Sequence, residues 1–147
     1  WHLANKPIPS LSGGEFQRTL VAMALTQEAA VMLLDEPTAS LDLAHQTGIM
    51  DLVRNVQKQR GGGVVVAMHD LTLAAQYCNR LVMLAEGQAY ADGSPRSVLT
   101  KENISAVYGA SVAILAHPRG GTPVVLPMPS DGSKRSHERY GGFVSNP

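Results

Sequence analysis

Apolar residues recur along the chain with two different spacings, which predict helices and strands in turn. Apolar positions at the spacing of one helix face occur in three segments: 12–27, 43–59 and 71–78. Continuous apolar runs of strand length, typical of strands covered on both faces, are 29–34, 64–68 and 81–84. Strands that alternate with helices in this order predict an α/β fold with a mostly parallel sheet and right-handed crossovers.

The helical spacing also predicts which side chains face the core. In the first helix this stripe consists of Phe16, Leu20, Met23 and Ala24. In the second helix the apolar side contains Ile49, Leu52, Val53 and Val56.

The C-terminal third contains shorter elements. A Glu86-Gly87 turn predicts a hairpin between 81–84 and 88–92. Two short helices and two short strands are expected after it, at 95–100, 102–108, 112–115 and 124–126. From Ser130 onward Gly, Ser and charged residues leave almost no apolar anchor, so we expect one domain over 1–127 and a disordered tail over 128–147.

Two of the predicted strands end in side chains that can carry chemistry. Asp35 and Glu36 follow the first strand, and His69 and Asp70 follow the second. Ligands of open parallel sheets bind beyond the carboxyl ends of the strands, so these residues predict a shared site. Adjacent carboxylates on a strand point in different directions. One can therefore hold Mg²⁺, while the other activates a water that attacks a γ-phosphate.

Other polar residues that could bind a ligand, and His69 itself, also have a purely structural interpretation. Ser12 and Glu15 have the spacing of a capping box, although Gly13 and Gly14 between them also leave backbone N–H groups open to an anion. Asp42 is a natural N-cap for the second helix. His69, taken alone, is more typical of a hydrogen-bonded structural histidine.

Composition narrows the choice of partners. The formal net charge of zero gives no electrostatic argument for nucleic acid as a partner. Cys78 is the only cysteine, which excludes an internal disulfide and fits a reducing compartment. We see no signal peptide, and the apolar runs are too short to span a bilayer, so a role at a membrane requires a partner.

Four motifs, in their order and spacing, resemble the ATPase subunits of ABC transporters. They are LSGGEFQR at 11–18, VMLLDEP at 31–37, ASLD at 39–42 and VVVAMHD at 64–70. The resemblance covers about residues 1–127 and implies a P-loop NTPase (ABC ATPase) core. No G-x-x-x-x-G-K-[ST] phosphate loop occurs in the 147 residues, so we expect an incomplete core and an inactive isolated chain.

The resemblance implies a role for each candidate residue. Asp35 ends the Walker B strand and binds Mg²⁺, Glu36 is the catalytic glutamate, and His69 is the switch histidine that contacts the γ-phosphate of ATP. The remaining residues contact a nucleotide bound mainly by a second ATPase subunit in a head-to-tail dimer. They are Ser12, Gly13, Gly14 and Glu15 of the ABC signature and, in the D-loop at 40–42, Asp42.

Finer segments resemble importers of metal chelates, the group that handles iron siderophores, haem and vitamin B12. These segments are LDLAHQ at 41–46, HDLTLAAQYCNR at 69–80, GSPRSVLT at 93–100 and GGTPVVLP at 120–127. This resemblance implies transmembrane permease subunits as partners and a peripheral location on the cytoplasmic face of the plasma membrane.

Two other functions stay open at this point. A soluble ABC-type ATPase of repair or translation usually carries coiled-coil insertions or tandem cassettes, and this chain has neither. A truncated, non-catalytic product that binds partners is favoured by the missing phosphate loop.

Overall fold

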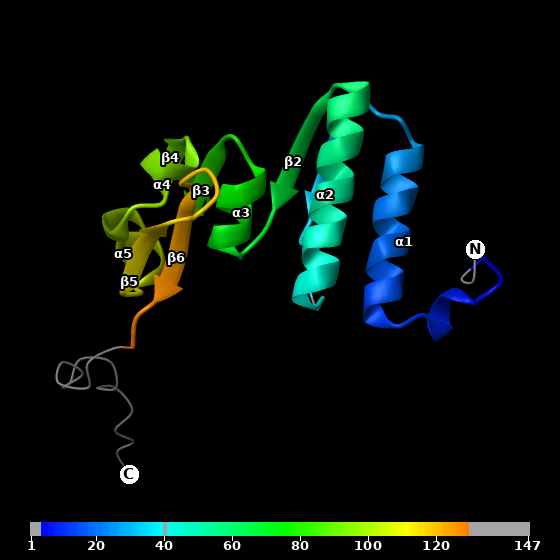
Figure 1. Cartoon of the computed structure of the whole chain (residues 1–147), viewed down its shortest axis with the longest axis horizontal. Coiled ribbons are helices and arrows are strands. Elements are labelled where there is room, and N and C mark those ends of the chain that lie inside the picture. The colour runs from blue at the N-terminus through cyan, green and yellow to red at the C-terminus, as the bar shows by residue number, and fades with distance from the viewer. Residues whose placement is uncertain (1–3, 40, 130–147) are drawn as a thin grey trace, which may run out of the picture.

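A computed structural model describes residues 4–39 and 41–129 of the chain (Figure 1). Ser40 of the predicted D-loop and the predicted tail from residue 130 onward lie outside the described residues. The N-terminal elements are η1 (Ile8–Ser10), α1 (Gly13–Thr26), β1 (Val31–Asp35), α2 (Leu43–Arg60), β2 (Gly63–Ala67) and α3 (Leu71–Tyr77). The C-terminal elements are β3 (Leu81–Ala85), β4 (Gln88–Gly93), α4 (Pro95–Val98), α5 (Lys101–Tyr108), β5 (Val112–Ala116) and β6 (Pro123–Pro127). The predicted helices and strands are therefore confirmed, with small shifts at their ends.

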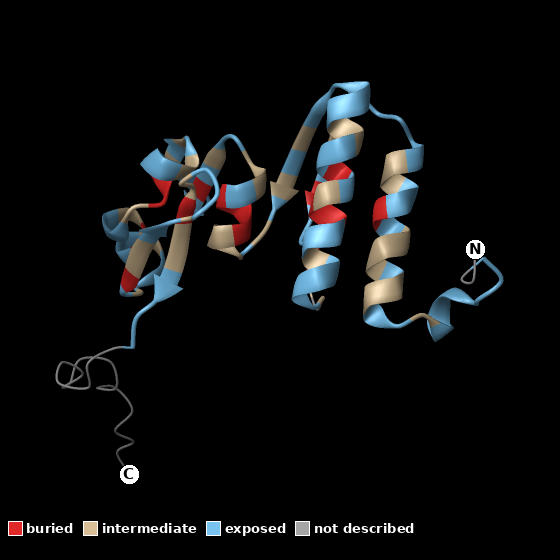
Figure 2. Ribbon diagram, viewed as in Figure 1, coloured by how far each residue is buried: buried red, intermediate tan, exposed pale blue. Residues whose placement is uncertain are grey.

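The N-terminal half is built on the parallel pair β1–β2, with Leu34 opposite Val66. Helices α1 and α2 lie side by side and cover one face of this pair (Figure 1). The buried residues between helices and strands, which form one of the two buried groups in Figure 2, are Val21, Leu34, Ile49 and Val53.

The predicted apolar stripe of α1 is mostly wrong. Phe16, Leu20 and Met23 are exposed, and only Ala24 of that stripe packs on the core. The helix is instead turned so that Val21 faces β1 and α2. Helical spacing allowed both stripes, and the contact with α2 decides between them. On α2 the prediction is confirmed for Ile49 and Val53, whereas Leu52 is exposed.

The C-terminal half packs around two antiparallel hairpins. The predicted hairpin β3–β4 forms through the Glu86-Gly87 turn, and β5 pairs with β6. Thr72 of α3 attaches the second hairpin, because its hydroxyl accepts a hydrogen bond from the Val125 N–H at 3.0 Å. The buried residues of this half are Ala75, Met83, Val98, Leu99, Ile104 and Val112.

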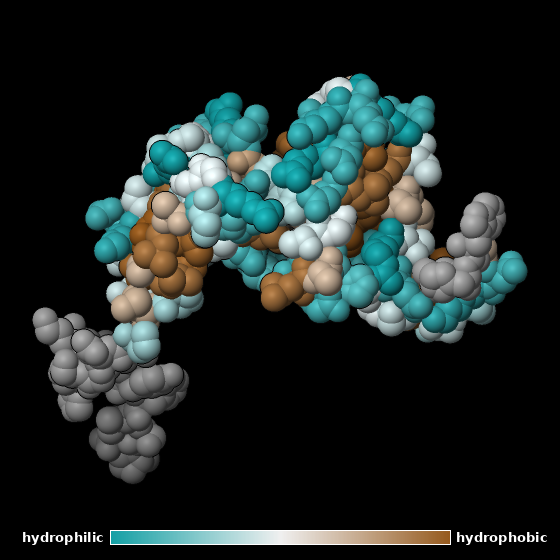
Figure 3. All heavy atoms as spheres, viewed as in Figure 1, coloured by the Kyte–Doolittle hydropathy of each residue, from teal (hydrophilic) through white to brown (hydrophobic). Residues whose placement is uncertain are grey.

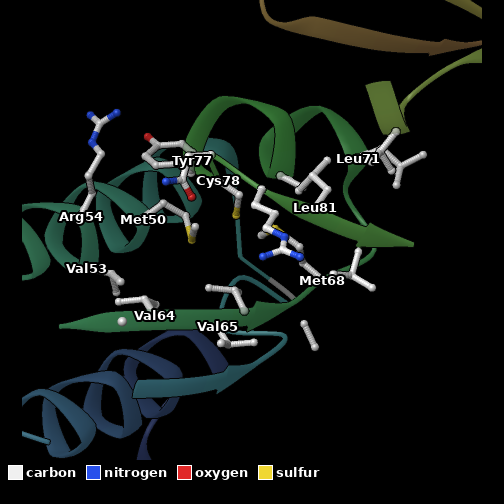
Figure 4. A pocket seen from close by; sticks show the side chains of 18 of the residues that line it. Met50, Val53, Arg54, Val64, Val65, Met68, Leu71, Tyr77, Cys78 and Leu81 are labelled. Atoms are coloured by element: carbon white, nitrogen blue, oxygen red, sulfur yellow. The ribbon is translucent and has the colours of Figure 1, made fainter. Parts of the chain in front are cut away.

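The expectation of one sheet containing all three apolar strands is wrong for β3. Strand β3 pairs with β4 only, and the described strands form three separate two-stranded sheets. A cavity of about 980 Å³ lies between β2 and β3, lined by apolar side chains such as Val65 and Leu81 (Figure 4). An apolar run predicts a strand but not its neighbour, and here the described chain supplies no strand between β2 and β3.

A small polar cluster joins the two halves beside this cavity. The Tyr77 hydroxyl of α3 lies 3.1 Å from Oδ1 of Asp51 on α2, and the Arg54 guanidinium lies 4.9 Å from the centre of the Tyr77 ring. These contacts connect α2 to α3 directly.

The second face of β1–β2 is open, although the apolar runs predicted cover on both faces. Val31, Leu33 and Val65 are exposed there, Leu33 to 74%. Hydrophobic atoms also reach the surface near α1 and α2 and over the β5–β6 hairpin (Figure 3). Parallel strands are normally covered on both faces, so this half presents an uncovered apolar sheet face.

Candidate active site

The ends of β1 and β2 meet at one edge of the parallel sheet. The register places Asp35 beside Ala67, and the Glu36 N–H donates to the Ala67 carbonyl at 2.9 Å. This pairing carries His69 to the same edge, where its Nδ1 lies 3.3 Å from Oε1 of Glu36. Both side chains are exposed, so the pair is open to a ligand.

The carboxylate of Asp35 lies at the same edge. Asp35 is exposed, and within the described residues its side chain makes no hydrogen bond or ion pair. Residues 4–39 and 41–129 contain no group of three or more His, Cys, Asp or Glu side chains that could hold a metal ion. A single free carboxylate fits Mg²⁺, because this ion keeps most of its waters and is usually held by one or two carboxylates together with substrate phosphates.

Glu36 has an unusual backbone conformation. Its φ is 42°, in the left-handed region that residues with a β-carbon rarely adopt. Pro37 and Thr38, directly after it, are buried, and the Ala39 N–H closes the turn on the Glu36 carbonyl at 3.0 Å. Such conformations persist only where neighbouring contacts hold them, and they cluster at functional sites.

The start of α1 forms the capping box that the sequence predicted. The Glu15 N–H donates to the Ser12 hydroxyl at 3.3 Å, and the Ser12 N–H donates to Oε2 of Glu15 at 2.8 Å. A β-carbon on Gly13 would meet nothing within 4 Å, so the helix start is open on that side. A β-carbon on Gly14 would come within 3.1 Å of the Leu41 side chain. The segment 12–15 therefore combines an intact cap, open space and a close contact with the loop after β1.

The side-chain carboxyl of Glu15 has a strongly lowered pKa. The Lys6 ammonium, 2.8 Å from Oε2, and the Ser12 N–H together lower the pKa of Glu15 from 4.5 to about 2. Because the pKa is lowered on folding, the contribution of this carboxylate to stability is full above about pH 4.5. It is lost as the pH falls toward 2.

We expect the Glu15 carboxyl to titrate with a midpoint near pH 2 in a ¹³C NMR titration of the chain. Lys6→Gln should move the midpoint toward 4.5, because the Lys6 contact is the largest cause of the shift. Lys58→Gln on α2 is the matched control and should leave it in place. A wild-type midpoint near 4.5 would show that the Lys6–Glu15 pair does not form in solution.

The acidic residues at the other two helix starts act as caps. Asp42 Oδ1 accepts the His45 N–H at 2.9 Å and lies 2.8 Å from the His45 ring, and these contacts lower the pKa of Asp42. Asp70 Oδ1 accepts the Leu73 N–H at 2.8 Å. The interpretation of Asp42 as an N-cap is therefore confirmed, and Asp70 caps α3 in the same way.

Only some of the predicted site residues contact one another. Glu36 and His69 are in direct contact, and Asp35 is adjacent in the chain. No hydrogen bond or ion pair within the described part joins Ser12 or Asp42 to Glu36 or His69. Gln17, which the sequence did not single out, makes the link, because its Nε2 donates to the Glu36 carbonyl at 3.2 Å.

Sequence comparisons find similarity to ATP-binding proteins of ABC transporters. Residues 1–39 match the ABC transporter family. The chain is 49% identical over 126 residues to the cobalamin import ATP-binding protein BtuD of Halobacterium salinarum and 41% identical over 127 residues to the ferric enterobactin transport ATP-binding protein FepC of Escherichia coli. Each match covers 86% of this chain, but 32% of the first relative and 47% of the second. The chain thus spans about a third to a half of these relatives.

Solved structures match the fold as well. A transporter described as of the metal-chelate ABC type, in an inward-facing conformation, superposes with a TM-score of 0.76 at 29% identity, over 88% of this chain and 52% of that chain. The dimeric ATP-binding cassette MJ0796 bound to ADP and Pi gives a TM-score of 0.60 at 33% identity, over 65% of this chain and 40% of that chain.

Fold and sequence point to the same class. The chain is similar to part of the ATP-binding domain of ABC transporters, and its fold matches that of solved ABC-type ATP-binding cassettes. Within that class it resembles the ATP-binding subunits of importers for cobalamin and ferric enterobactin and a metal-chelate type ABC transporter.

Proposed function

We propose that this chain is the C-terminal portion of an ATPase subunit that powers import of a metal chelate: an iron siderophore, haem or cobalamin. The observation that carries the proposal is the contact between Glu36 and His69 at the carboxyl edge of a parallel sheet. The Asp35 carboxylate lies beside it and has no hydrogen bond or ion pair among the described residues. That edge is where ligands of open α/β sheets bind. The choice of cargo is supported by the functions of similar proteins, which import cobalamin, ferric enterobactin and hemin.

In this proposal each residue at the edge has one task. Glu36 orients a water and accepts its proton as the water attacks the γ-phosphate. His69, 3.3 Å away, donates a hydrogen bond to a γ-phosphate oxygen and keeps the water aligned. Asp35 holds Mg²⁺, which supplies positive charge to the phosphate oxygens when it is bound.

The open start of α1 is proposed to act on a second subunit. In a head-to-tail dimer, Ser12, Gly13 and Gly14 contact the ATP that the partner's phosphate loop holds, and Asp42 lies near the same interface. Backbone N–H groups at a helix start suit the negative charge of a phosphate, and the open space over Gly13 lets it approach.

Attachment to the membrane is proposed to go through permease subunits, on the cytoplasmic face. Among the helices of the described residues, none is long and apolar enough to cross a bilayer. Binding of the ATPase dimer to the permease would couple ATP hydrolysis to movement of the chelate.

The test compares two proteins, this 147-residue chain and an intact subunit in which the same sequence is joined to a phosphate-loop region. We expect the intact subunit to hydrolyse Mg-ATP. The chain alone should bind ATP weakly without turnover, because the phosphate-loop lysine supplies major phosphate contacts. Turnover by the chain alone, above that of its Glu36→Gln variant, would contradict the proposal.

The cargo is tested separately, in vesicles that contain the intact subunit and its permease. ATP-dependent uptake of a ferric siderophore, haem or cobalamin is expected. Robust ATP turnover with uptake of none of the three would leave the ATPase assignment in place and refute the proposed cargo.

A further inference from the structure

The backbone of Glu36 is held by three hydrogen bonds from three parts of the chain. Its N–H donates to the Ala67 carbonyl of β2 at 2.9 Å. Its carbonyl accepts from the Ala39 N–H at 3.0 Å and from Nε2 of Gln17 at 3.2 Å. Of the two bonds to the carbonyl, only the one from Gln17 comes from outside the loop itself.

These bonds matter because the conformation they hold is unfavourable. The φ of 42° at Glu36 brings its β-carbon into conflict with its own backbone, so a lone peptide would rarely adopt it. With this backbone conformation, Oε1 of Glu36 lies 3.3 Å from Nδ1 of His69. Releasing the carbonyl therefore allows the carboxylate to turn away from His69.

Gln17 belongs to the same helix as Ser12. Gln17 is half-buried and lies five residues after Ser12. At the rise of an α-helix, five residues correspond to about 7–8 Å along the helix axis. The first turn of α1 also lies close to the loop after β1, because a β-carbon on Gly14 would come within 3.1 Å of the Leu41 side chain. The segment 12–15 is thus linked to Glu36 through α1 and the hydrogen bond from Gln17.

We propose that Gln17 is a positioning residue, which fixes the carbonyl of Glu36 and through it the direction of the catalytic carboxylate. Gln17 also makes the direction of the Glu36 carboxylate depend on the position of α1. When the segment 12–15 of the same helix binds a partner's nucleotide, the position of α1 therefore affects the direction of Glu36 in the same chain. This inference rests on the proposed function of Glu36.

The test replaces Gln17 by Met, which keeps the length of the side chain and removes the donor. The matched control is Gln57→Met. Gln57 is also half-buried on a helix, and its Nε2 donates to the Gly62 carbonyl at 3.2 Å, away from the site. In the intact subunit, Gln17→Met should lower kcat about three- to tenfold, the range that loss of one hydrogen bond produces. KM for ATP should not change, and Gln57→Met should leave both constants unchanged.

A second measurement does not depend on ATP. In the 147-residue chain, Gln17→Met should speed amide hydrogen exchange at Ala39 about three- to tenfold, because the turn on the Glu36 carbonyl loses its support. Gln57→Met should not change it. Gln17→Glu, a polar replacement without a donor, should act like Gln17→Met and guards against a packing defect of Met.

The outcomes separate the two proposals. An intact wild-type subunit without ATP turnover refutes the proposed function. An active wild type with unchanged kcat and unchanged Ala39 exchange in Gln17→Met and Gln17→Glu refutes the positioning role alone. A loss of kcat accompanied by an equal rise in KM also refutes it, because that result indicates weaker nucleotide binding and not a misplaced base.

Discussion

Replacing Glu36 by Gln is expected to lower kcat of the intact subunit about a hundredfold or more, while the affinity for ATP stays within a few-fold of wild type. Gln matches Glu in shape and can adopt the same backbone, but its amide cannot accept a proton from the attacking water. Turnover is measured by phosphate release and affinity by calorimetry with Mg-ATP. Near-normal turnover in the variant would remove Glu36 from the role of base.

The matched control is Glu28→Gln. Glu28 also has a left-handed backbone, with φ of 50°, and one long charged contact, 3.4 Å from Arg60. It lies between α1 and β1, and removing its charge should leave kcat unchanged. A similar loss in both variants would mean that any change of charge in this half of the chain disturbs turnover.

Asp35→Asn separates the metal from the base. The amide is a weaker ligand for Mg²⁺ than the carboxylate, so the variant should require more Mg²⁺ for half-maximal turnover. Its turnover at saturating Mg²⁺ should exceed that of Glu36→Gln. The two neighbouring carboxylates would then have distinct roles, as their position at the end of a strand predicts.

The elements of this fold could be read from the sequence because each carries a local pattern. Helix α2 begins at the Asp42 cap and ends at Gly61, which has φ of 75°, and both signals are visible in the sequence. The β3–β4 hairpin follows its Glu86-Gly87 turn in the same way. These features depend on residues close together in the chain.

Arrangements that depend on distant residues could not be predicted as well. Strand β3 pairs with β4 and not with β2, and an apolar run carries no information on its neighbour. The orientation of α1, which buries Val21 and exposes Phe16, is set by its contact with α2. Both errors have the same origin, since periodicity gives a face or an element but not its partner.

In the candidate site, too, some contacts follow from local sequence patterns and others depend on residues far apart in the chain. Glu36 and His69 could be placed together because parallel strands bring their carboxyl ends to one edge. The contact of Gln17 with Glu36 joins a helix and a loop that are 19 residues apart in the sequence, and no spacing pattern predicts it. The Lys6–Glu15 pair, which determines the pKa of Glu15, joins the capping box to the N-terminal segment and was missed for the same reason.

Ser12→Asp is expected to abolish ATP-induced dimerisation of the intact subunit without unfolding it. Asp is as good an N-cap as Ser, and Glu15 can still accept the backbone N–H of residue 12. The new carboxylate would lie where the partner's γ-phosphate is proposed to bind. Repulsion between these charges in a closed, partly dry interface should block the dimer, and with it hydrolysis. ATP should still bind to the subunit's own phosphate loop.

The chain contains a matched control for this variant in Ser94→Asp. Ser94 caps α4 with the same geometry, its hydroxyl accepting the Ser97 N–H at 3.3 Å, as Ser12 accepts Glu15 at 3.3 Å. Both variants should melt near the wild-type temperature, and only Ser12→Asp should stay monomeric with ATP in analytical ultracentrifugation. Dimerisation of Ser12→Asp at wild-type strength would mean that Ser12 acts only as a cap. Failure of both variants to dimerise would mean that added negative charge, and not its position at the start of α1, opposes assembly.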